Sequence, residues 1–242
     1  MALAIDIQQV DKRFALRHTR SLKETFLWVI KGRRGDLYQK FSALNEVSLS
    51  VNEGETVALL GFNGSGKSTL LKHISGVMLP DNGTVRTRGR VAGLIEVGAG
   101  FHPDLSGRDN VFLNGAILGM SETEIHDQFD SIVEFSEIGE FIDTEVRFYS
   151  SGMYLRLAFA VAVHTNPDVF LIDEILAVGD EPYQKKCLEK IRELNAAGKT
   201  LVVVSHDLDL VSQICSRGVV MERGSVVLDA PVADAVAYIR SR

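Results

Sequence analysis

The stretch Gly61–Thr69 reads GFNGSGKST and matches the pattern G-x-x-x-x-G-K-[ST]. It follows directly on the apolar run Val57–Leu60, which predicts a strand, and it precedes the helix-forming run Leu70–Ile74. Its three glycines let the backbone curl with its amide groups pointing inward, and the helix that follows presents a positive N-terminus. A strand, a glycine-rich loop and a helix in this order predict a phosphate site. The alternative is a glycine-rich turn with a chance Lys-Ser pair.

The polar residues of this loop take different roles at a phosphate site. We expect the Lys67 ammonium group to reach the outer phosphates of a nucleotide, and the Ser68 hydroxyl to take a place around Mg²⁺. The loop residues expected to contact the nucleotide are Gly61, Asn63, Gly64, Ser65, Gly66, Lys67, Ser68 and Thr69.

Length and composition bound the class of protein. The 242 residues, 45% of them apolar, suffice for one large domain or a main domain with a subdomain. The formal net charge is -6, so the chain has no overall basic field of the kind that attracts nucleic acid. Cys187 and Cys215 lack metal-ligand spacing, and no run approaches the roughly 20 apolar residues needed to cross a bilayer. We expect a cytosolic protein that, where a membrane is involved, works beside it.

The N-terminal region holds two features beyond the core pattern. Residues 4–10 alternate as a strand, after which Phe14 is placed to stack on an adenine ring, although an edge or core phenylalanine is the alternative. Ser21–Glu24 reads as a capping box, and the apolar residues that follow share one helical face near Trp28 and a basic cluster. Residues 18–40 therefore predict an inserted helix at a membrane surface or membrane-embedded partner, or a surface helix packed on the core.

The periodicity changes along the rest of the chain. Strand patterns up to residue 95 give way to helical patterning over 98–166, which predicts an inserted helical subdomain. After it, apolar strands alternate with helices and predict a parallel sheet whose strand ends face the ligand. The predicted strands are 42–51, 57–60, 84–87, 91–95, 169–172, 200–204, 219–221 and 225–228, and the predicted helices are 111–118, 122–138, 155–163, 183–196 and a short one ending at 242.

An apolar strand delivers two adjacent carboxylates. Val169–Ile172 ends at Asp173, which is suited to hold Mg²⁺, and at Glu174, which is suited to orient and deprotonate an attacking water. Two acids at the tip of a buried strand are costly unless a cation or a proton transfer requires them there.

A second helix start has the chemistry of an anion site. Ser150, Ser151 and Gly152 precede the helical run that continues to Val163. Because Lys67 already holds the phosphates of one nucleotide, we expect this turn to close over a nucleotide bound by a neighbouring copy. An ordinary helix cap at Ser150 is the alternative.

The order of phosphate loop, serine-glycine signature, strand with Asp-Glu and strand ending in His resembles the nucleotide-binding subunit of ABC transporters over nearly the whole chain. The resemblance implies an α/β P-loop NTPase fold in one domain of residues 1–242, with a RecA-like core, an antiparallel β subdomain and the inserted helical subdomain. It implies ATP and Mg²⁺ as cofactors and a head-to-tail homodimer in which Ser150 and Gly152 contact the γ-phosphate in trans. Asp180 then lies in the segment that crosses between the two sites and contacts the nucleotide, and His206, which by itself would more often be structural, senses the γ-phosphate.

Four details narrow the resemblance. The signature reads YSSGM, Ile-Leu follows Glu174, the next segment is AVGD, and residues 98–110 read GAGFHPDLSGRDN. Together with the insertion, they resemble the ATPases that power export of polysaccharides such as O-antigen, capsule, teichoic acid and galactan. This implies a peripheral subunit on the cytoplasmic face of the inner membrane, an integral-membrane permease that carries a lipid-linked glycan and docks near Phe101–Asp109, and no nucleic-acid partner. The alternatives are export of another substrate, a soluble ABC ATPase acting on nucleic acid or ribosomes, and a catalytically idle scaffold.

Two features depart from the family pattern. Glu96 stands nearest to the position where a glutamine often touches Mg²⁺, and a carboxylate there can ligate the metal but repels the γ-phosphate when the metal is absent. The chain ends at Arg242, so the resemblance leads us to expect a system in which this subunit does not recognise a modified end of the glycan through an added domain.

Overall fold

The structure, a computed structural model, describes residues 2–16, 39–93, 100–173 and 180–242. Its strands are β1 (Leu3–Leu16), β2 (Gln39–Asn52), β3 (Thr56–Leu60), β4 (Asn82–Thr87), β5 (Val91–Gly93), β6 (Val169–Asp173), β7 (Thr200–Val204), β8 (Arg217–Glu222) and β9 (Ser225–Pro231). Its helices are α2 (Lys67–Ile74), α3 (Gly107–Ile117), α4 (Glu122–Ser136), α5 (Ser151–His164), α6 (Glu181–Ala196), α7 (Leu208–Ile214) and α8 (Val232–Arg240), with short 3-10 turns at Gly139–Phe141 and Val146–Phe148.

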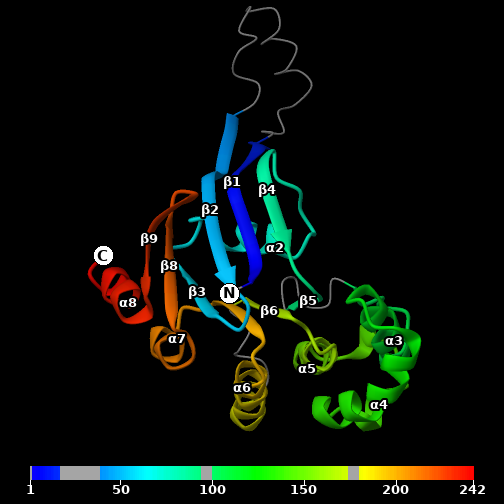
Figure 1. Cartoon of the computed structure of the whole chain (residues 1–242). Coiled ribbons are helices and arrows are strands. Elements are labelled where there is room, and N and C mark those ends of the chain that lie inside the picture. Colours follow the sequence, from blue (N-terminus) through cyan, green and yellow to red (C-terminus); the bar gives the residue numbers. More distant parts are fainter. Residues whose placement is uncertain (1, 17–38, 94–99, 174–179) are drawn as a thin grey trace, which may run out of the picture.

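Two sheets form the body of the molecule (Figure 1). An antiparallel sheet has the order β2-β1-β4, and a six-stranded sheet has the order β5-β6-β7-β3-β8-β9, in which only β9 runs antiparallel to its neighbour. All five residues of β3 and all five of β7 are buried. Strands covered on both faces read as continuous apolar runs, which is why the sequence pattern located them.

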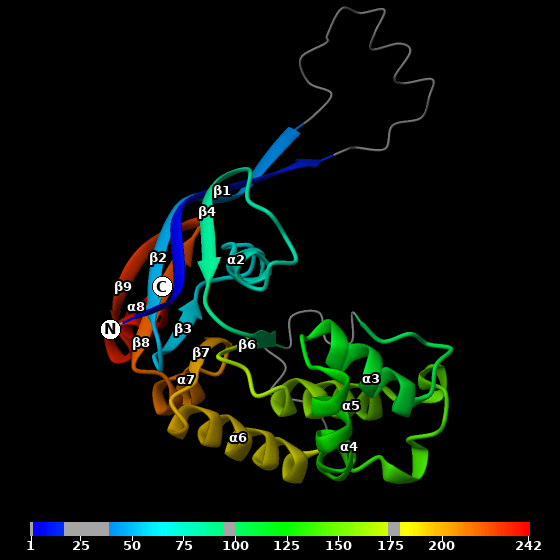
Figure 2. The ribbon, with the colours of Figure 1, turned by 45° about the vertical axis from the view of Figure 1, so that its right-hand side comes forward.

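The six-stranded sheet carries a separate apolar cluster on each face. Leu70, Leu71 and Ile74 of α2 pack with residues of β1, β2 and one face of β3, so α2 lies between the two sheets. The other face is covered by α5, α6, α7 and α8, whose buried residues include Phe159 and Tyr183 (Figures 1 and 2). The order of layers is therefore antiparallel sheet, α2, six-stranded sheet and helices.

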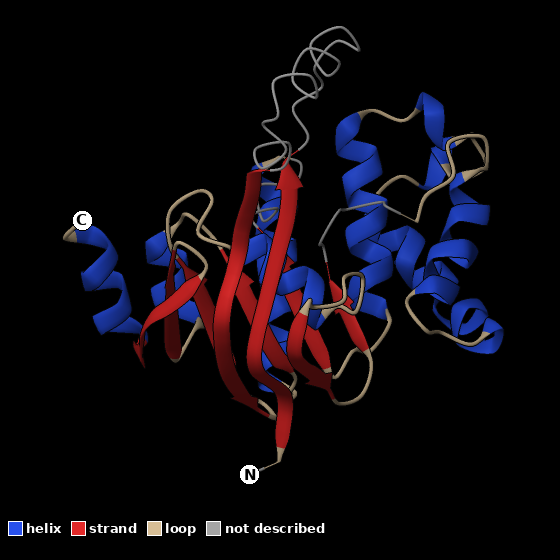
Figure 3. Ribbon diagram, turned by 90° about the horizontal axis from the view of Figure 1, so that it is seen from above, coloured by secondary structure: helices blue, strands red, loops and turns tan. Residues whose placement is uncertain are grey.

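Helices α3, α4 and α5 build a third apolar cluster beside the sheets, seen at the right of Figures 1 and 3. Ser106 and Ser121 start α3 and α4 with capping boxes, each completed by an acidic residue three positions later. Helix α5 belongs to two clusters, because Leu157 and Val161 face α3 and α4 while Phe159 faces the six-stranded sheet. We refer to α3, α4 and α5 as the helical subdomain.

Several predicted elements differ in length from those of the structure. Strand β1 runs to Leu16, well beyond residue 10, and pairs with β2 from Leu3↔Asn52 to Leu16↔Gln39. Register shifts between Ile7 and Arg13 interrupt the alternation and so hide the length of this strand from a pattern search. Residues 39 and 40, included in the predicted insertion, belong to β2, and residues 17–38 with the predicted helix lie outside the described residues. Helix α7 was not predicted.

Within the described ranges, no helix has the length and apolar character that a membrane span requires.

Candidate nucleotide site

The phosphate loop owes its shape to its glycines. Gly61, Gly64 and Gly66 have φ angles of 141°, 78° and 107°, values that residues with side chains rarely adopt. A Cβ atom on Gly61 would lie 2.3 Å from the Met221 carbonyl oxygen, and one on Gly66 would lie 2.6 Å from the Ala43 carbonyl oxygen. The loop is therefore held between β8 on one side and β2 on the other.

The donor groups of the loop fit an anion. Lys67, the first residue of α2, is buried, and its Nζ donates hydrogen bonds to the carbonyl oxygens of Gly61 at 2.7 Å and Phe62 at 3.3 Å. Ser65 is 5% exposed, and its Oγ has no hydrogen-bond partner among the residues that the structure describes. Helix α2 has neither a side-chain cap nor an acidic residue in its first turn. A lysine, an unsatisfied hydroxyl and an uncapped helix start together suit a phosphate.

Three strand ends meet beside this loop. Strands β6, β7 and β3 are parallel neighbours, and Val204 is in register with Asp173 on one side and Leu59 on the other. Asp173, the Ser205-His206 pair and the phosphate loop therefore leave the same edge of the sheet. The structure brings together three predicted elements that lie more than thirty residues apart in the chain.

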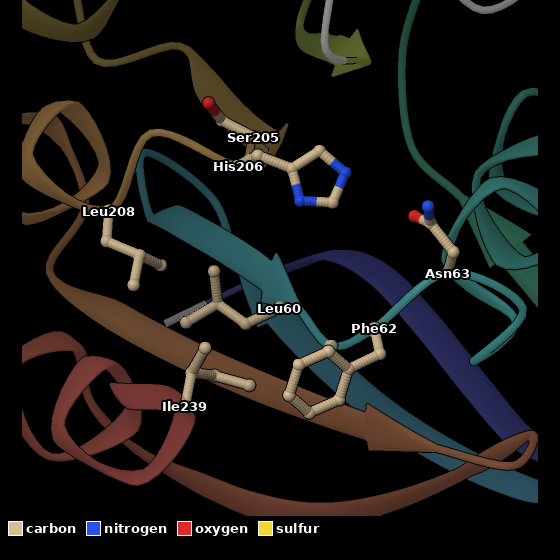
Figure 4. Close-up of a pocket in the computed structure, with 8 residues that line it drawn as sticks. Leu60, Phe62, Asn63, Ser205, His206, Leu208 and Ile239 are labelled. Carbon is tan, nitrogen blue, oxygen red and sulfur yellow. The ribbon is translucent and has the colours of Figure 1, made fainter. Parts of the chain in front are cut away.

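His206 lines a pocket with the phosphate loop (Figure 4). The pocket has a volume of about 400 Å³ and is lined by Leu60, Gly61, Phe62, Asn63, Ser205, His206, Leu208 and Ile239. His206 and Asn63 contribute its nitrogen-bearing side chains, while Leu60, Phe62 and Ile239 form an apolar wall in Figure 4. The predicted position of His206 next to the nucleotide is compatible with this arrangement, and its sensor role stays a prediction.

Two described residues are candidate ligands of the expected Mg²⁺ ion. Ser68 is exposed at the start of α2, and Asp173 is half-buried at the end of β6. Among the residues that the structure describes, no three His, Cys, Asp or Glu side chains are grouped as a metal cage. Mg²⁺ commonly takes one or two protein ligands and completes its shell with phosphate and water, so Ser68 and Asp173 suffice in number. Glu96 and Glu174 lie outside the described residues.

Phe14 lies inside β1 and not in a loop after it. Its ring is half-buried, Lys12 Nζ lies 6.0 Å from the ring centroid, and Phe41 of β2 is its cross-strand partner. Phe41 is 47% exposed and comes two residues before Ala43, whose carbonyl faces Gly66. Sequence reasoning did not place Phe41 beside Phe14, since only the β1–β2 register does so. The stacking role of Phe14 stays a prediction.

The serine-glycine turn caps its own helix. Ser150 is the N-cap of α5, and its Oγ accepts a hydrogen bond from the Met153 amide at 3.2 Å, so within one chain Ser150 is an ordinary cap. Ser150 and Ser151 are exposed, and Gly152 is partly exposed. Their contact with a nucleotide of a second copy stays a prediction.

The residue before this turn anchors it. Tyr149 Oη donates a hydrogen bond to the Phe141 carbonyl oxygen at 2.8 Å, and burial raises the pKa of the Tyr149 phenol to about 12. A Cβ on Gly107 would lie 2.0 Å from the same phenol oxygen, so glycine at this position leaves room for the tyrosine.

Asp180 is the N-cap residue of α6. Its side chain makes no cap hydrogen bond, and its Oδ1 instead accepts one from Arg156 Nη2 at 2.6 Å. The predicted nucleotide contact of Asp180 is untested in the single chain.

A sequence profile of the family described as ABC transporter matches residues 44–177, more than half of the chain. The chain belongs to the ABC transporter family. The matched range contains the phosphate loop, the serine-glycine turn and Asp173, which are three of the four elements on which the resemblance was based; the strand that ends at His206 lies beyond it.

Two curated relatives of this family show how similar the sequence is. The O-antigen export system ATP-binding protein RfbB of Myxococcus xanthus is 46% identical over 228 residues, which cover 92% of this chain and 52% of the relative. The teichoic acids export ATP-binding protein TagH of Listeria monocytogenes is 41% identical over 224 residues, which cover 93% of this chain and 66% of the relative. The chain thus spans between half and two thirds of the length of these relatives.

Solved structures confirm the expected ABC-type α/β fold. The dimeric structure of an ATP-binding cassette in a post-hydrolysis state, bound to ADP and Pi, superposes with a TM-score of 0.75. The match covers 94% of this chain and 98% of that cassette at 24% sequence identity.

Proposed function

We propose that this chain is the ATP-hydrolysing subunit of an ABC transporter that exports a lipid-linked polysaccharide of the O-antigen, teichoic acid or galactan type across the cytoplasmic membrane. The observation that carries the proposal is the meeting of the phosphate loop, Asp173 and His206 at one sheet edge. The relatives named for O-antigen and teichoic acid export support the substrate class. Residues 1–242 form one ABC ATPase domain in this proposal, with 18–40 as an interfacial insertion and 98–166 as the helical subdomain.

ATP is bound through the loop. Lys67 exchanges its contacts with the loop carbonyls for phosphate oxygens, and the amides at the start of α2 bind the same anion. Ser68 and Asp173 hold Mg²⁺, which when bound neutralises charge on the phosphates. Asn63, Ser65 and Thr69 complete the loop's contacts, and Phe14 stacks on the base.

Hydrolysis needs a water and a base. Glu174, next to Asp173 in the sequence, takes a proton from a water whose oxygen bonds to the γ-phosphorus, and the bond from that phosphorus to the bridging oxygen breaks to give ADP and phosphate. His206 contacts the γ-phosphate from the end of β7. A second copy completes each site with Ser150, Ser151 and Gly152, which are accessible at the start of α5.

The proposed location of this subunit follows from its proposed partner in the membrane. An integral-membrane permease carries the glycan, and this subunit binds it as a peripheral protein at the cytoplasmic face. Phe101–Asp109, which leads into the helical subdomain, is the proposed docking segment, and Leu105 in it is 36% exposed. The net charge of -6 favours a protein partner over nucleic acid.

Replacing the proposed base tests the chemistry. Glu174→Gln keeps the shape of the side chain but cannot accept the proton, so we expect ATP turnover, alone and with the permease, to fall at least about a hundredfold. Glu193→Gln is the matched control, because Glu193 is an exposed glutamate paired with Lys190 and lies toward the other end of α6, away from the proposed machinery. Turnover of Glu174→Gln equal to that of the control would refute the assignment.

Depletion of the chain in its own cells tests the substrate class. We expect lipid-linked glycan to accumulate inside and surface polysaccharide to decrease, with recovery on expression of the wild-type chain or Glu193→Gln but not Glu174→Gln. Unchanged surface polysaccharide would contradict export of this class of substrate.

A further inference from the structure

One arginine of α5 joins three helices. Arg156 Nη1 donates to Glu137 Oε2 at 2.9 Å, and its Nη2 donates to Asp180 Oδ1 at 2.6 Å. Its guanidinium carbon lies 4.4 Å from the centroid of the Tyr183 ring, and Tyr183 Oη donates back to the Arg156 carbonyl oxygen at 3.1 Å. The end of α4, the middle of α5 and the start of α6 are therefore connected through a single side chain.

A lysine of α6 completes the connection. Lys186 Nζ donates to Glu137 Oε1 at 3.0 Å and to the Phe135 carbonyl oxygen at 3.0 Å. Glu137 thus offers one carboxylate oxygen to α5 and the other to α6. We call Glu137, Arg156, Asp180 and Lys186 the helix clamp; it contains two cations and two carboxylates.

The backbone of Glu137 supports a specific role for its carboxylate. Glu137 ends α4 with a φ of 57°, in the left-handed region that glycine or asparagine adopts more easily. A glutamate at such a position is unfavourable for the backbone, and the hydrogen bonds that its carboxylate accepts from Arg156 and Lys186 offset this cost.

The helix clamp lies between two segments of the proposed dimer interface. Arg156 stands less than two helical turns after Ser150, so the serine-glycine turn moves with it as part of one helix. Asp180 is the N-cap residue of α6 and belongs to the segment expected to cross between the two sites. Both segments act in trans in the proposed function.

We propose that Arg156 is a positioning residue that fixes the start of α5 relative to the start of α6, so that each copy presents both segments to its partner as one preformed surface. The inference rests on the proposed function. Without the clamp, the two segments are ordered only when the copies meet, and this ordering lowers the affinity of the copies for each other. Binding of ATP to the copy's own phosphate loop does not involve the clamp.

The difference between these two steps defines the experiment. Binding of a fluorescent ATP analogue is measured at protein concentrations where the chain is monomeric, and Mg-ATP-dependent dimerisation is followed by light scattering in the Glu174→Gln background. For Arg156→Gln we expect ATP affinity within about twofold of the parent and a dimer dissociation constant raised about tenfold. Glu137→Asn removes the carboxylate while suiting the left-handed backbone, and we expect the same pattern.

An arginine–aspartate contact of the same length elsewhere in the molecule serves as the control. Arg240 Nη2 donates to Asp209 Oδ1 at 2.6 Å and joins α8 to α7, away from α5 and α6. Arg240→Gln therefore removes an arginine–aspartate contact of the same length between two helices, and we expect unchanged dimerisation. Arg156→Lys, which keeps the charge but cannot reach both carboxylates in the same fork geometry, should restore part of the dimer affinity.

The results that would overturn this inference differ from the result that would contradict the proposed function. Arg156→Gln and Glu137→Asn dimers as stable as the parent would overturn the inference, and so would a loss of monomer ATP affinity or of thermal stability that matches the loss of dimer. A parent chain that binds ATP but does not dimerise at any concentration would contradict the proposed function, and with it this inference.

Discussion

The molecule contains two helix starts rich in glycine and serine, and they differ in how their amide groups are satisfied. At α2 the cap residue is Gly66 in the left-handed conformation. Within the described part of the chain, no side chain caps this helix, and the nearby buried Ser65 hydroxyl has no hydrogen-bond partner. At α5 the cap is Ser150, whose own hydroxyl accepts from the Met153 amide. The first start is open to an anion bound by its own chain. The second has one of its amides capped by its own serine and exposes both serines.

This comparison suggests that the two helix starts have different roles in the proposed ATPase. The start of α2 is sufficient to hold the phosphates in a single chain, while the start of α5 acts only on a ligand that a second copy brings. Substitutions at the two sites should therefore separate ATP binding from hydrolysis.

The largest effect is expected from Gly66→Ala. The new Cβ at a φ of 107° would lie 2.6 Å from the Ala43 carbonyl oxygen, so the loop must move to make room. We expect ATP affinity of the monomer to fall about thirtyfold and the free energy of unfolding to fall by about 2 kcal/mol. Titration with a fluorescent ATP analogue and denaturant melts measure the two quantities.

Gly64→Ala is the matched control for this prediction. Gly64 has a φ of 78°, but no described residue lies within 4 Å of its Cβ position, so in the nucleotide-free chain we expect only backbone strain, which lowers the free energy of unfolding by about 1 kcal/mol. Equal losses of unfolding free energy for Gly66→Ala and Gly64→Ala would show that the contact with β2 does not shape the loop.

An intermediate effect is expected from Ser150→Ala. Loss of the cap should lower the free energy of unfolding by about 1 kcal/mol, leave the monomer's ATP affinity unchanged, and reduce hydrolysis by the dimer about tenfold. Steady-state ATPase assays at saturating ATP measure the last effect.

Ser121→Ala separates capping from the role in trans. Ser121 caps α4 through the same kind of hydroxyl-to-amide contact, to the Glu124 amide, and lies outside the proposed interface. We expect the same loss of stability without the loss of hydrolysis. If both variants hydrolyse ATP equally, Ser150 is only a cap.

The smallest effect concerns alkaline pH at the second helix start. Burial raises the pKa of Tyr149 to about 12, whereas the phenol of an unfolded chain ionises near 10. The unfolded state therefore loses this proton first, and the stabilising contribution, complete below about pH 10, is lost as pH rises toward 12. Denaturant melts at several pH values should show a shallower decline for Tyr149→Phe than for the parent. Parallel declines would show that this phenol ionises equally in both states.

The sequence predicted those elements whose pattern is local. Strand β7 was predicted with both of its ends, because the buried threonine Thr200 and the four buried apolar residues that follow it are bounded by Lys199 and Ser205. The phosphate loop, Asp173 and His206 were found for the same reason, since each lies at the end of an apolar strand. Their meeting at one edge followed from the rule that parallel strands end together.

Tertiary contacts were beyond sequence reasoning. The members of the helix clamp come from the end of α4, the middle of α5 and the start of α6, and no local spacing relates them. Phe41 gains its place beside Phe14 only through the β1–β2 register, and β1 itself was read too short because bulges disturb its alternation. Helix α7 was not predicted because its seven residues, capped by Asp207, are too few for a helical period to show.

The end of α8 has a practical consequence for work with this protein. Ile239 lines the same pocket as His206 and Asn63, and it lies three residues before Arg242 (Figure 4). Any polypeptide fused after Arg242 thus starts within about 10 Å of that pocket, even if those last residues are fully extended. Affinity tags and fluorescent labels intended for assays of turnover are better attached before β1, the middle strand of the antiparallel sheet (Figure 1).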